Sequence, residues 1–297
     1  MGYSLWKMSE KLSVKPASSQ LHPPGLYIVA TPIGNLRDIT MRALDILELA
    51  DLIVCEDTRV TAKLLSHFGI KKPTLSYNDH NGEERRPKIL EALKDGQLIA
   101  LVSDAGTPLV SDPGYKLVKE AVAENIHVSA LPGASSVLMA LCVSGLPSDR
   151  FFFAGFLPAK QEACRKEIAA LKTVPATLLF FESARRLTEA LALLLEGMGN
   201  RQAAVARELT KLYEECRRGT LDELIAHYVK HSAPKGEVVI VVGPPGEAAM
   251  DAQDIKKQLG LLLTSHSVKE AASILAEQTG QPRKEIYTLA LTLLDKK

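Results

Sequence analysis

Several classes of protein carry marks that this sequence lacks. Its 297 residues include only four cysteines, Cys55, Cys142, Cys164 and Cys216, and no two of them form a Cys-x-x-Cys pair. This usage argues against a zinc ribbon and a disulfide framework, and it fits a reducing, cytoplasmic compartment. No apolar run approaches the ~20 residues of a membrane-spanning helix. We therefore expect no membrane partner.

The common nucleotide and hydrolase motifs are missing as well. No Gly-x-Gly-x-x-Gly follows a predicted strand, and there is no Gly-x-x-x-x-Gly-Lys-[Ser/Thr] and no Gly-x-Ser-x-Gly. The dinucleotide fingerprint, the P-loop and the nucleophile elbow are thereby excluded. His227 and His231 could share a helix face, but no third ligand accompanies them, so we interpret them as solvated and expect no metal site.

Charge of one sign is not in excess, because the formal net charge is only +1. Any contact with nucleic acid must therefore come from a local basic patch rather than from the field of the whole protein. Hydrophobic residues make up 46% and charged residues 24% of the chain, which is ordinary for a globular protein. The length suits two domains with a small third.

The pattern of apolar segments predicts an α/β protein of two α/β domains followed by a small helical module. We expect a flexible tail at 1–25, an α/β domain at 26–145, a second at 150–245 and a helix-turn-helix-like extension at 251–297. In the first domain, apolar strands alternate with helices, which is typical of a parallel sheet. The second domain has the same alternation, and we expect more antiparallel pairing there. The extension is only mildly basic, so a structural or dimerisation role competes with RNA contact.

The chain is organised around the stretch Ala100–Gly114. It begins as an apolar strand and continues as a long loop with two carboxylates, Asp104 and Asp112. We expect Asp112 to cap the next helix and Pro113 to occupy its first turn. Asp38 or Thr40 is expected to cap the first helix of the domain. Ligands of open α/β sheets bind at such carboxyl ends of strands.

Polar loops also follow other predicted strands. They are Pro32–Gly34, Glu56–Arg59, Asp104–Pro108, Pro132–Ser136, Glu182–Arg185 and Arg207–Lys211. In a parallel sheet the first four would lie on one rim, and loops from both domains would line a small-molecule cleft. Carboxylates and turn amides suit a ligand with hydroxyls, an adenine edge and positive charge.

Ordered motifs carry a resemblance to one family. They are Leu26–Thr40, Glu56–Arg59, Leu101–Pro108, Ser111–Gly114, Leu131–Gly133, Gly145–Arg150, Gly155–Pro158 and Ala206–Lys211. Together they resemble the ribosomal RNA small-subunit methyltransferase I family, which has the tetrapyrrole-methylase-like fold. The similarity covers roughly 26–243, with a weaker echo in the helical extension.

The resemblance implies S-adenosylmethionine (SAM) as cofactor and 2′-O-methylation of a cytidine in the decoding region of 16S rRNA in the small ribosomal subunit. It also implies a homodimer. By position, the SAM site would comprise Pro32, Ile33, Gly34, Asp104, Gly106, Thr107, Leu109, Ala134, Ser135, Glu182, Ala206 and Leu209. The loop after Gly133 departs from the family pattern, which affects the part assigned to Ala134.

Several roles stay open at the level of sequence. Candidates for the base that takes the ribose proton are Glu182, Glu208, Asp57 and His80, with Asp79 beside His80. Glu182 could instead bind the cofactor ribose, and Glu208 could pair with a neighbouring cation. Basic side chains beside the loops are expected to contact RNA phosphates: Arg59, Arg185, Arg186, Arg207 and Lys211. The alternatives are a SAM-dependent methylase of a tetrapyrrole-like small molecule, and a non-catalytic nucleic-acid-binding protein.

Overall fold

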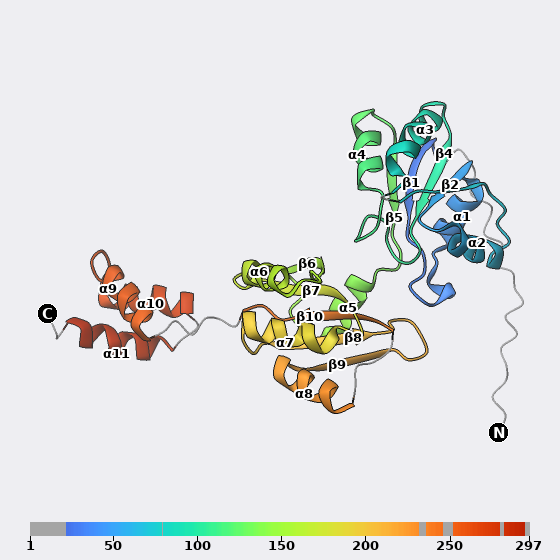
Figure 1. Cartoon of the computed structure of the whole chain (residues 1–297). Helices are drawn as coiled ribbons and strands as arrows, with labels where there is room; N and C mark the ends of the chain where they lie inside the picture. Colours follow the sequence, from blue (N-terminus) through green and yellow to red (C-terminus); the bar gives the residue numbers. More distant parts are fainter. Residues whose placement is uncertain (1–21, 79, 232–235, 246–251, 280–281, 295–297) are drawn as a thin grey trace, which may run out of the picture. The chain divides into compact units, whose positions relative to one another are not determined.

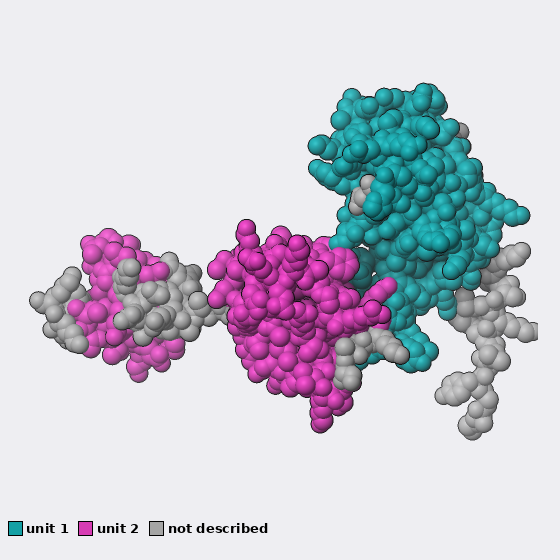
Figure 2. All heavy atoms as spheres, viewed as in Figure 1, with its two compact units in different colours: residues 1–140, 207–215 teal, residues 141–206, 216–297 magenta. Residues whose placement is uncertain are grey.

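The computed structural model describes residues 22–78, 80–231, 236–245, 252–279 and 282–294 (Figure 1). Contacts divide the chain into two units (Figure 2), one within Met1–Ala140 and Arg207–Glu215 and the other within Leu141–Ala206 and Cys216–Lys297. The short segment 207–215 therefore belongs to the first unit, although in sequence it interrupts the second unit.

The first unit is built on a five-stranded parallel sheet with the order β3-β2-β4-β1-β5. Its strands are β1 (Gly25–Val29), β2 (Leu52–Cys55), β3 (Thr74–Ser76), β4 (Leu98–Val102) and β5 (Val128–Leu131). The predicted parallel sheet is confirmed. Because all its strands run in one direction, the loops that follow them leave from the same edge.

Helices cover both faces of this sheet. They are α1 (Met41–Leu49), α2 (Thr58–His67), α3 (Gly82–Lys94) and α4 (Tyr115–Ala123), with a short 3₁₀ turn η2 at Leu36–Asp38. Strand β4 is apolar throughout because its alternate residues meet different helices. Ala100 packs in a cluster with α1 and α2, whereas Leu101 packs in a cluster with α3 and α4.

Two helix starts were predicted from side-chain caps. Thr40 caps α1, since its Oγ1 accepts a hydrogen bond from the Ala43 N–H at 3.1 Å. The prediction for Asp112 and Pro113 is wrong, because α4 begins only at Tyr115 and no side chain caps it. The reason is Gly114, which has φ +130° and lies so close to β4 that an added Cβ would be 2.9 Å from Leu101 Cδ2. Asp112 therefore stays in the loop.

The second unit contains a mixed sheet with the order β6-β7-β10-β8-β9. Its strands are β6 (Phe151–Phe156), β7 (Thr177–Ser183), β8 (Gln202–Arg207), β9 (Glu215–Thr220) and β10 (Glu237–Val242). Strand β10 is antiparallel to β7, whereas β6 is parallel to β7. The antiparallel pair agrees with the expectation of more antiparallel pairing in this domain than in the first. Helices α6 (Gln161–Leu171), α7 (Leu187–Met198) and α8 (Leu221–His231) form one buried core with this sheet.

Four more helices complete the described chain. Helix α5 (Ser136–Ser144) lies where the chain passes from the first unit to the second. Helices α9 (Ala252–Leu262), α10 (Val268–Thr279) and α11 (Arg283–Leu294) confirm the predicted helical extension. They share an apolar core of their own that includes Leu259, Leu275 and Ile286. None of the described helices is long and apolar enough to cross a membrane.

Candidate functional site

Three loops meet at the carboxyl edge of the parallel sheet. Thr31, just after β1, exchanges two backbone hydrogen bonds with Gly106, each 2.9 Å long. The Thr107 hydroxyl donates to the Ala134 carbonyl at 3.1 Å. These bonds join the Pro32–Gly34 loop, the loop that follows β4 and the loop that follows β5, as the one-rim prediction requires.

The loop after β4 has an unusual backbone. Gly106 has φ +84°, and a Cβ placed on it would lie 3.4 Å from Ile33 Cγ2 and 3.9 Å from the Ala134 carbonyl oxygen. Leu109 and Ser111 also have left-handed conformations, with φ +74° and +63°. Such conformations cost of order 1–3 kcal/mol and persist where the surroundings hold them, which is common at ligand sites.

The segment 207–215 lies against the first loop of the same unit. The Lys211 side chain lies over Gly34, where an added Cβ would be 2.3 Å from Lys211 Cγ. Lys211 Nζ also pairs with Glu208 Oε1 at 3.0 Å. Glu208 and Thr210 have φ +47° and +67°. A second strained loop thus lies beside the Pro32–Gly34 loop.

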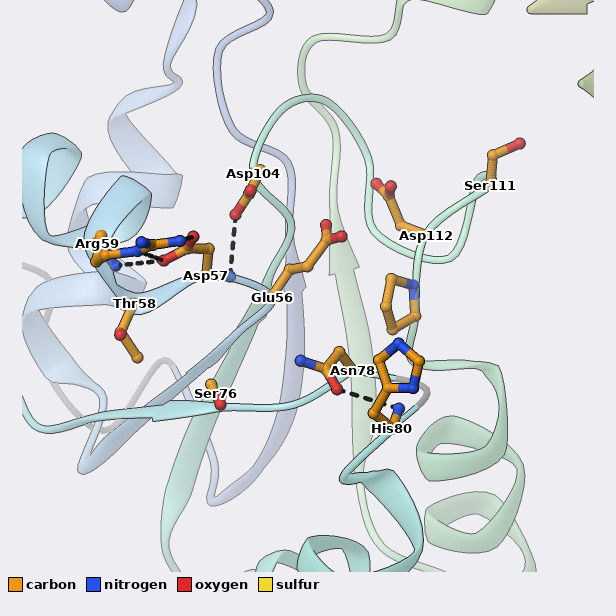
Figure 3. A pocket seen from close by; sticks show the side chains of 11 residues that line it. Glu56, Asp57, Thr58, Arg59, Ser76, Asn78, His80, Asp104, Ser111 and Asp112 are labelled. Carbon is orange, nitrogen blue, oxygen red and sulfur yellow. Dashed lines mark hydrogen bonds and ion pairs between the residues drawn. The ribbon is translucent and has the colours of Figure 1, made fainter.

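A polar pocket of ≈ 710 Å³ opens at the ends of β2, β3 and β4 (Figure 3). The residues that line it are Glu56, Asp57, Thr58, Arg59, Ser76, Asn78, His80, Asp104, Ser111, Asp112 and Pro113. Asp104 links the pocket to the joined loops, since its Oδ1 accepts the Asp57 N–H at 3.1 Å. Figure 3 shows the loop with Asp104 and Asp112 arching over one side, with Asn78 and His80 on the other.

The charges in this pocket are mainly negative. Hydrogen bonds from Arg59 lower the pKa of Asp57 to about 2. The Arg59 Nη2 to Asp57 Oδ2 distance is 2.5 Å, so this guanidinium is occupied by its neighbour. Burial raises the pKa of Asp104 and of Asp112. Carboxylates that lose water in this way interact more strongly with a donor group that replaces it.

The four candidate bases lie in different places. Asp57 and His80 line the pocket, and Glu208 lies in the 207–215 segment, where Lys211 pairs with it. Glu182 lies in β7 of the second unit and is 5% exposed. Asp79 lies outside the described residues.

Glu182 shares a face of β7 with Leu178 and Phe180, which belong to the helix-covered core. The Ser183 N–H donates to its Oε1 at 2.7 Å. Its Oε2 is 3.6 Å from Arg186 Nη2 and has no hydrogen-bond partner among the described residues. This arrangement leaves a buried acceptor with unused capacity.

The predicted RNA-contacting cations differ in how they are held. Arg186 donates to the carbonyls of Leu157 at 3.2 Å and of Pro158 at 2.9 Å, which anchors the guanidinium within the second unit. Its neighbour Arg185 is exposed. Arg207 pairs with Glu215 Oε2 at 3.3 Å. The predicted SAM residues are likewise divided: Glu182 and Ala206 belong to the second unit, and the others, Leu209 included, to the first.

Sequence reasoning did not single out Ser76 and Asn78 as pocket residues. Both follow from the sheet itself, because Ser76 ends β3, a parallel strand whose carboxyl end lies on the same rim. Within the described part of the chain, no group of three or more His, Cys, Asp or Glu side chains could hold a metal ion.

Comparisons with known proteins agree with this architecture. A family model described as Tetrapyrrole (Corrin/Porphyrin) Methylases matches residues 25–225. A second model, described as the RsmI C-terminal HTH domain, matches residues 249–294. Among solved structures, a diphthine synthase is similar with a TM-score of 0.56 and 20% identity, covering 73% of this chain and 89% of that one. A cobalt precorrin-4 methyltransferase has a TM-score of 0.55 and 19% identity, covering 73% and 94%. These structures show the fold alone.

Curated sequences are much more similar. A protein of Mesorhizobium japonicum named Ribosomal RNA small subunit methyltransferase I is 52% identical over 92% of this chain and 93% of its own length. Proteins of the same name from Erythrobacter litoralis and an Escherichia coli strain are 51% and 44% identical, covering 91% and 90% of this chain and 95% and 94% of their own lengths. The chain therefore belongs to the tetrapyrrole methylase family and, within it, to the ribosomal RNA small subunit methyltransferase I group.

Proposed function

We propose that this protein methylates the ribosomal RNA of the small ribosomal subunit, at the 2′-hydroxyl of a cytidine in the decoding region, with SAM as the methyl donor. The observation that carries the proposal is the 52% identity to a named small-subunit rRNA methyltransferase along more than nine-tenths of both chains. The solved cobalt precorrin-4 methyltransferase shares only 19% identity with this chain, so no specific observation favours a tetrapyrrole substrate.

The loops at the sheet edge fit the cofactor. Gly106 leaves space beside Ile33 and Ala134 that a side chain would reduce, so a ligand can approach the backbone closely. We propose that the joined loops hold SAM through Pro32, Ile33, Gly34, Asp104, Gly106, Thr107, Leu109, Ala134, Ser135 and Leu209. In the second unit, Ala206 and the unused acceptor of Glu182 are the proposed contributors. When bound, SAM supplies an activated methyl group on a sulfonium.

Transfer to a hydroxyl is an in-line displacement, for which alignment alone contributes on the order of 7–11 kcal/mol. The chain must also accept the ribose proton. Of the four candidate bases, three are carboxylates held by cations: Asp57 by Arg59, Glu208 by Lys211 and Glu182 by Arg186. His80 is an exposed pocket residue, and imidazole is the commonest general base in enzymes. His80 is therefore our choice for the base.

The remaining parts of the proposal concern partners. Exposed Arg185 is the foremost candidate for an RNA phosphate contact, with Arg59, Arg207 and Lys211 able to exchange their carboxylate partners for phosphate. Arg186 is already anchored to two carbonyl groups, so among the five cations it is the weakest candidate for an RNA phosphate contact. We also propose a cytoplasmic homodimer, with the helical module at 251–297 as an RNA-contacting or dimerisation element. We further propose that the two α/β domains span residues 26–145 and 150–245.

The test is a methylation assay on small ribosomal subunits that lack the modification. The protein is incubated with methyl-labelled SAM, and the label is mapped on the RNA. Label confined to one cytidine ribose is the expected result. Tight SAM binding without label on the RNA would remove this substrate and direct attention to small molecules.

A further inference from the structure

The polar pocket at the ends of β2, β3 and β4 lies beside the loops proposed to hold SAM. Its lining has hydrogen-bond donors and acceptors that are fixed in position. On one side lie the carboxylates of Glu56 and Asp112, whose ends are directed toward one another in Figure 3. An ionised carboxylate can only accept hydrogen bonds. The pocket therefore favours a ligand that presents donors at this side.

The opposite side carries a donor whose orientation is set by the backbone. Asn78 Oδ1 accepts the N–H groups of His80 and Asn81 at 3.1 and 3.2 Å. Only the oxygen of an amide can accept these bonds, so the NH₂ group must point the other way. Asn78 thus offers donors to the pocket.

Ser76 repeats this arrangement. Its Oγ accepts from Arg85 Nη1 at 2.7 Å and from Asn81 Nδ2 at 3.2 Å, which uses the acceptor capacity of the hydroxyl. The remaining function of the hydroxyl is to donate its proton. The pocket therefore has acceptors on the Glu56 side and donors on the Asn78 side.

We propose that this pocket receives the target base and reads it as cytosine, an inference that rests on the proposed rRNA methylation. Cytosine presents an amine donor at N4 beside acceptors at N3 and O2. Carboxylates accept from cytosine N4, and the Asn78 amide donates to the neighbouring acceptors. Uracil has an acceptor at position 4 and a donor at N3, so the contacts at these two positions become repulsive, whereas O2 is an acceptor in both bases.

The position and size of the pocket support this assignment. Its ≈ 710 Å³ lies within the usual range for small-ligand sites. Asp104 both lines the pocket and belongs to the loop proposed for SAM, so a base held here lies next to the methyl donor. The carboxylates are not arranged as a metal site among the described residues, and the net negative lining disfavours a phosphate.

The experiment compares subunits that carry cytidine or uridine at the mapped position. The initial rate of methyl transfer is measured for the parent protein, Glu56→Gln, Asn78→Asp and the exposed control Glu91→Gln on α3. We expect the parent and the control to prefer cytidine. A contact of this kind contributes about tenfold to selectivity, so Glu56→Gln lowers the cytidine-to-uridine ratio by about that factor.

Asn78→Asp gives the sharper result. It keeps the oxygen that accepts the His80 and Asn81 N–H groups but replaces the donor with an acceptor that suits uracil N3. We expect the cytidine rate to fall and the uridine rate to rise, with SAM affinity unchanged in a separate calorimetric titration. An unchanged ratio in both variants overturns the inference, as does a loss of SAM affinity with the ratio preserved. A parent protein that methylates neither RNA would instead overturn the proposed function, and this inference with it.

Discussion

Asp112 illustrates how a single residue can serve a site at a cost to the fold. Burial raises its pKa, which means that the folded state disfavours the charged carboxylate. For an acid with a raised folded-state pKa, stability increases as pH falls through that pKa toward the value in the unfolded chain. Asp112→Asn should therefore raise the free energy of unfolding at neutral pH, and the gain should shrink on acidification. Denaturant titrations across the pH range measure this, and a gain that grows toward low pH would contradict it.

Asp57 has the opposite behaviour. Its pKa of about 2 keeps it charged at every pH at which the enzyme is expected to work. A group that does not titrate cannot shape the pH profile of the rate. We predict that Asp57→Asn leaves the pH midpoint of the kcat profile in place, whereas His80→Gln lowers kcat about 10²–10⁴-fold. If the fall in kcat at low pH disappeared in Asp57→Asn, Asp57 rather than His80 would be the base.

Replacing two adjacent arginines one at a time should distinguish a contribution to stability from a contribution to RNA binding. Arg186 donates to the carbonyls of Leu157 and Pro158, so Arg186→Ala should destabilise the protein by roughly 1–3 kcal/mol. Exposed Arg185 should change stability by no more than about 0.5 kcal/mol when replaced by Ala, while RNA affinity falls. Thermal unfolding and filter binding on both variants check this. Equal effects of the two replacements on stability would show that the anchoring contacts of Arg186 carry little energy.

At the scale of elements, the start of α4 depends on one glycine. Gly114→Ala combines a φ of +130° with a Cβ 2.9 Å from Leu101 Cδ2, and such a residue costs of order 1–3 kcal/mol. Gly69 is the control for a positive φ in open surroundings, since its φ is +72° and no atom lies within 4 Å of an added Cβ. Chemical denaturation should show a larger loss for Gly114→Ala. Equal losses would mean that neither the approach to β4 nor the unusual φ of Gly114 adds to the ordinary cost of a positive φ.

This element also shows what the sequence could and could not predict. The strands of the first sheet and their parallel direction were predictable because their apolar runs alternate with helices and end in polar loops. The true start of α4 at Tyr115 was not predictable. An acidic residue before Pro113 resembles a helix start, and the approach of Gly114 to Leu101 joins parts of the chain that are distant in sequence. For Glu182, the alternation of Leu178, Phe180 and Glu182 was visible in the sequence and pointed to the helix-covered face.

At the scale of the whole molecule, the helical extension has its own core. Removal of residues 246–297 should therefore leave SAM affinity and the unfolding midpoint of the remaining chain nearly unchanged, while RNA affinity decreases if this region contacts RNA.

RNA binding by the full chain should weaken with salt, with a slope of roughly −0.7 per phosphate contact on single-stranded RNA. Binding that is insensitive to salt would contradict the phosphate contacts proposed for the arginines.

The segment 207–215 belongs to the first unit and lies over Gly34 through Lys211. During synthesis, the Pro32–Gly34 loop therefore leaves the ribosome long before the residues that complete its surroundings. The proposed cofactor site is finished only when the chain has grown past Glu215, by which point residues 141–206 of the second unit have also been made. A nascent chain interrupted at Ala140 would contain every strand of the parallel sheet and yet lack the segment that covers its first loop. Full binding at the proposed cofactor site is thus expected only after synthesis has passed Glu215.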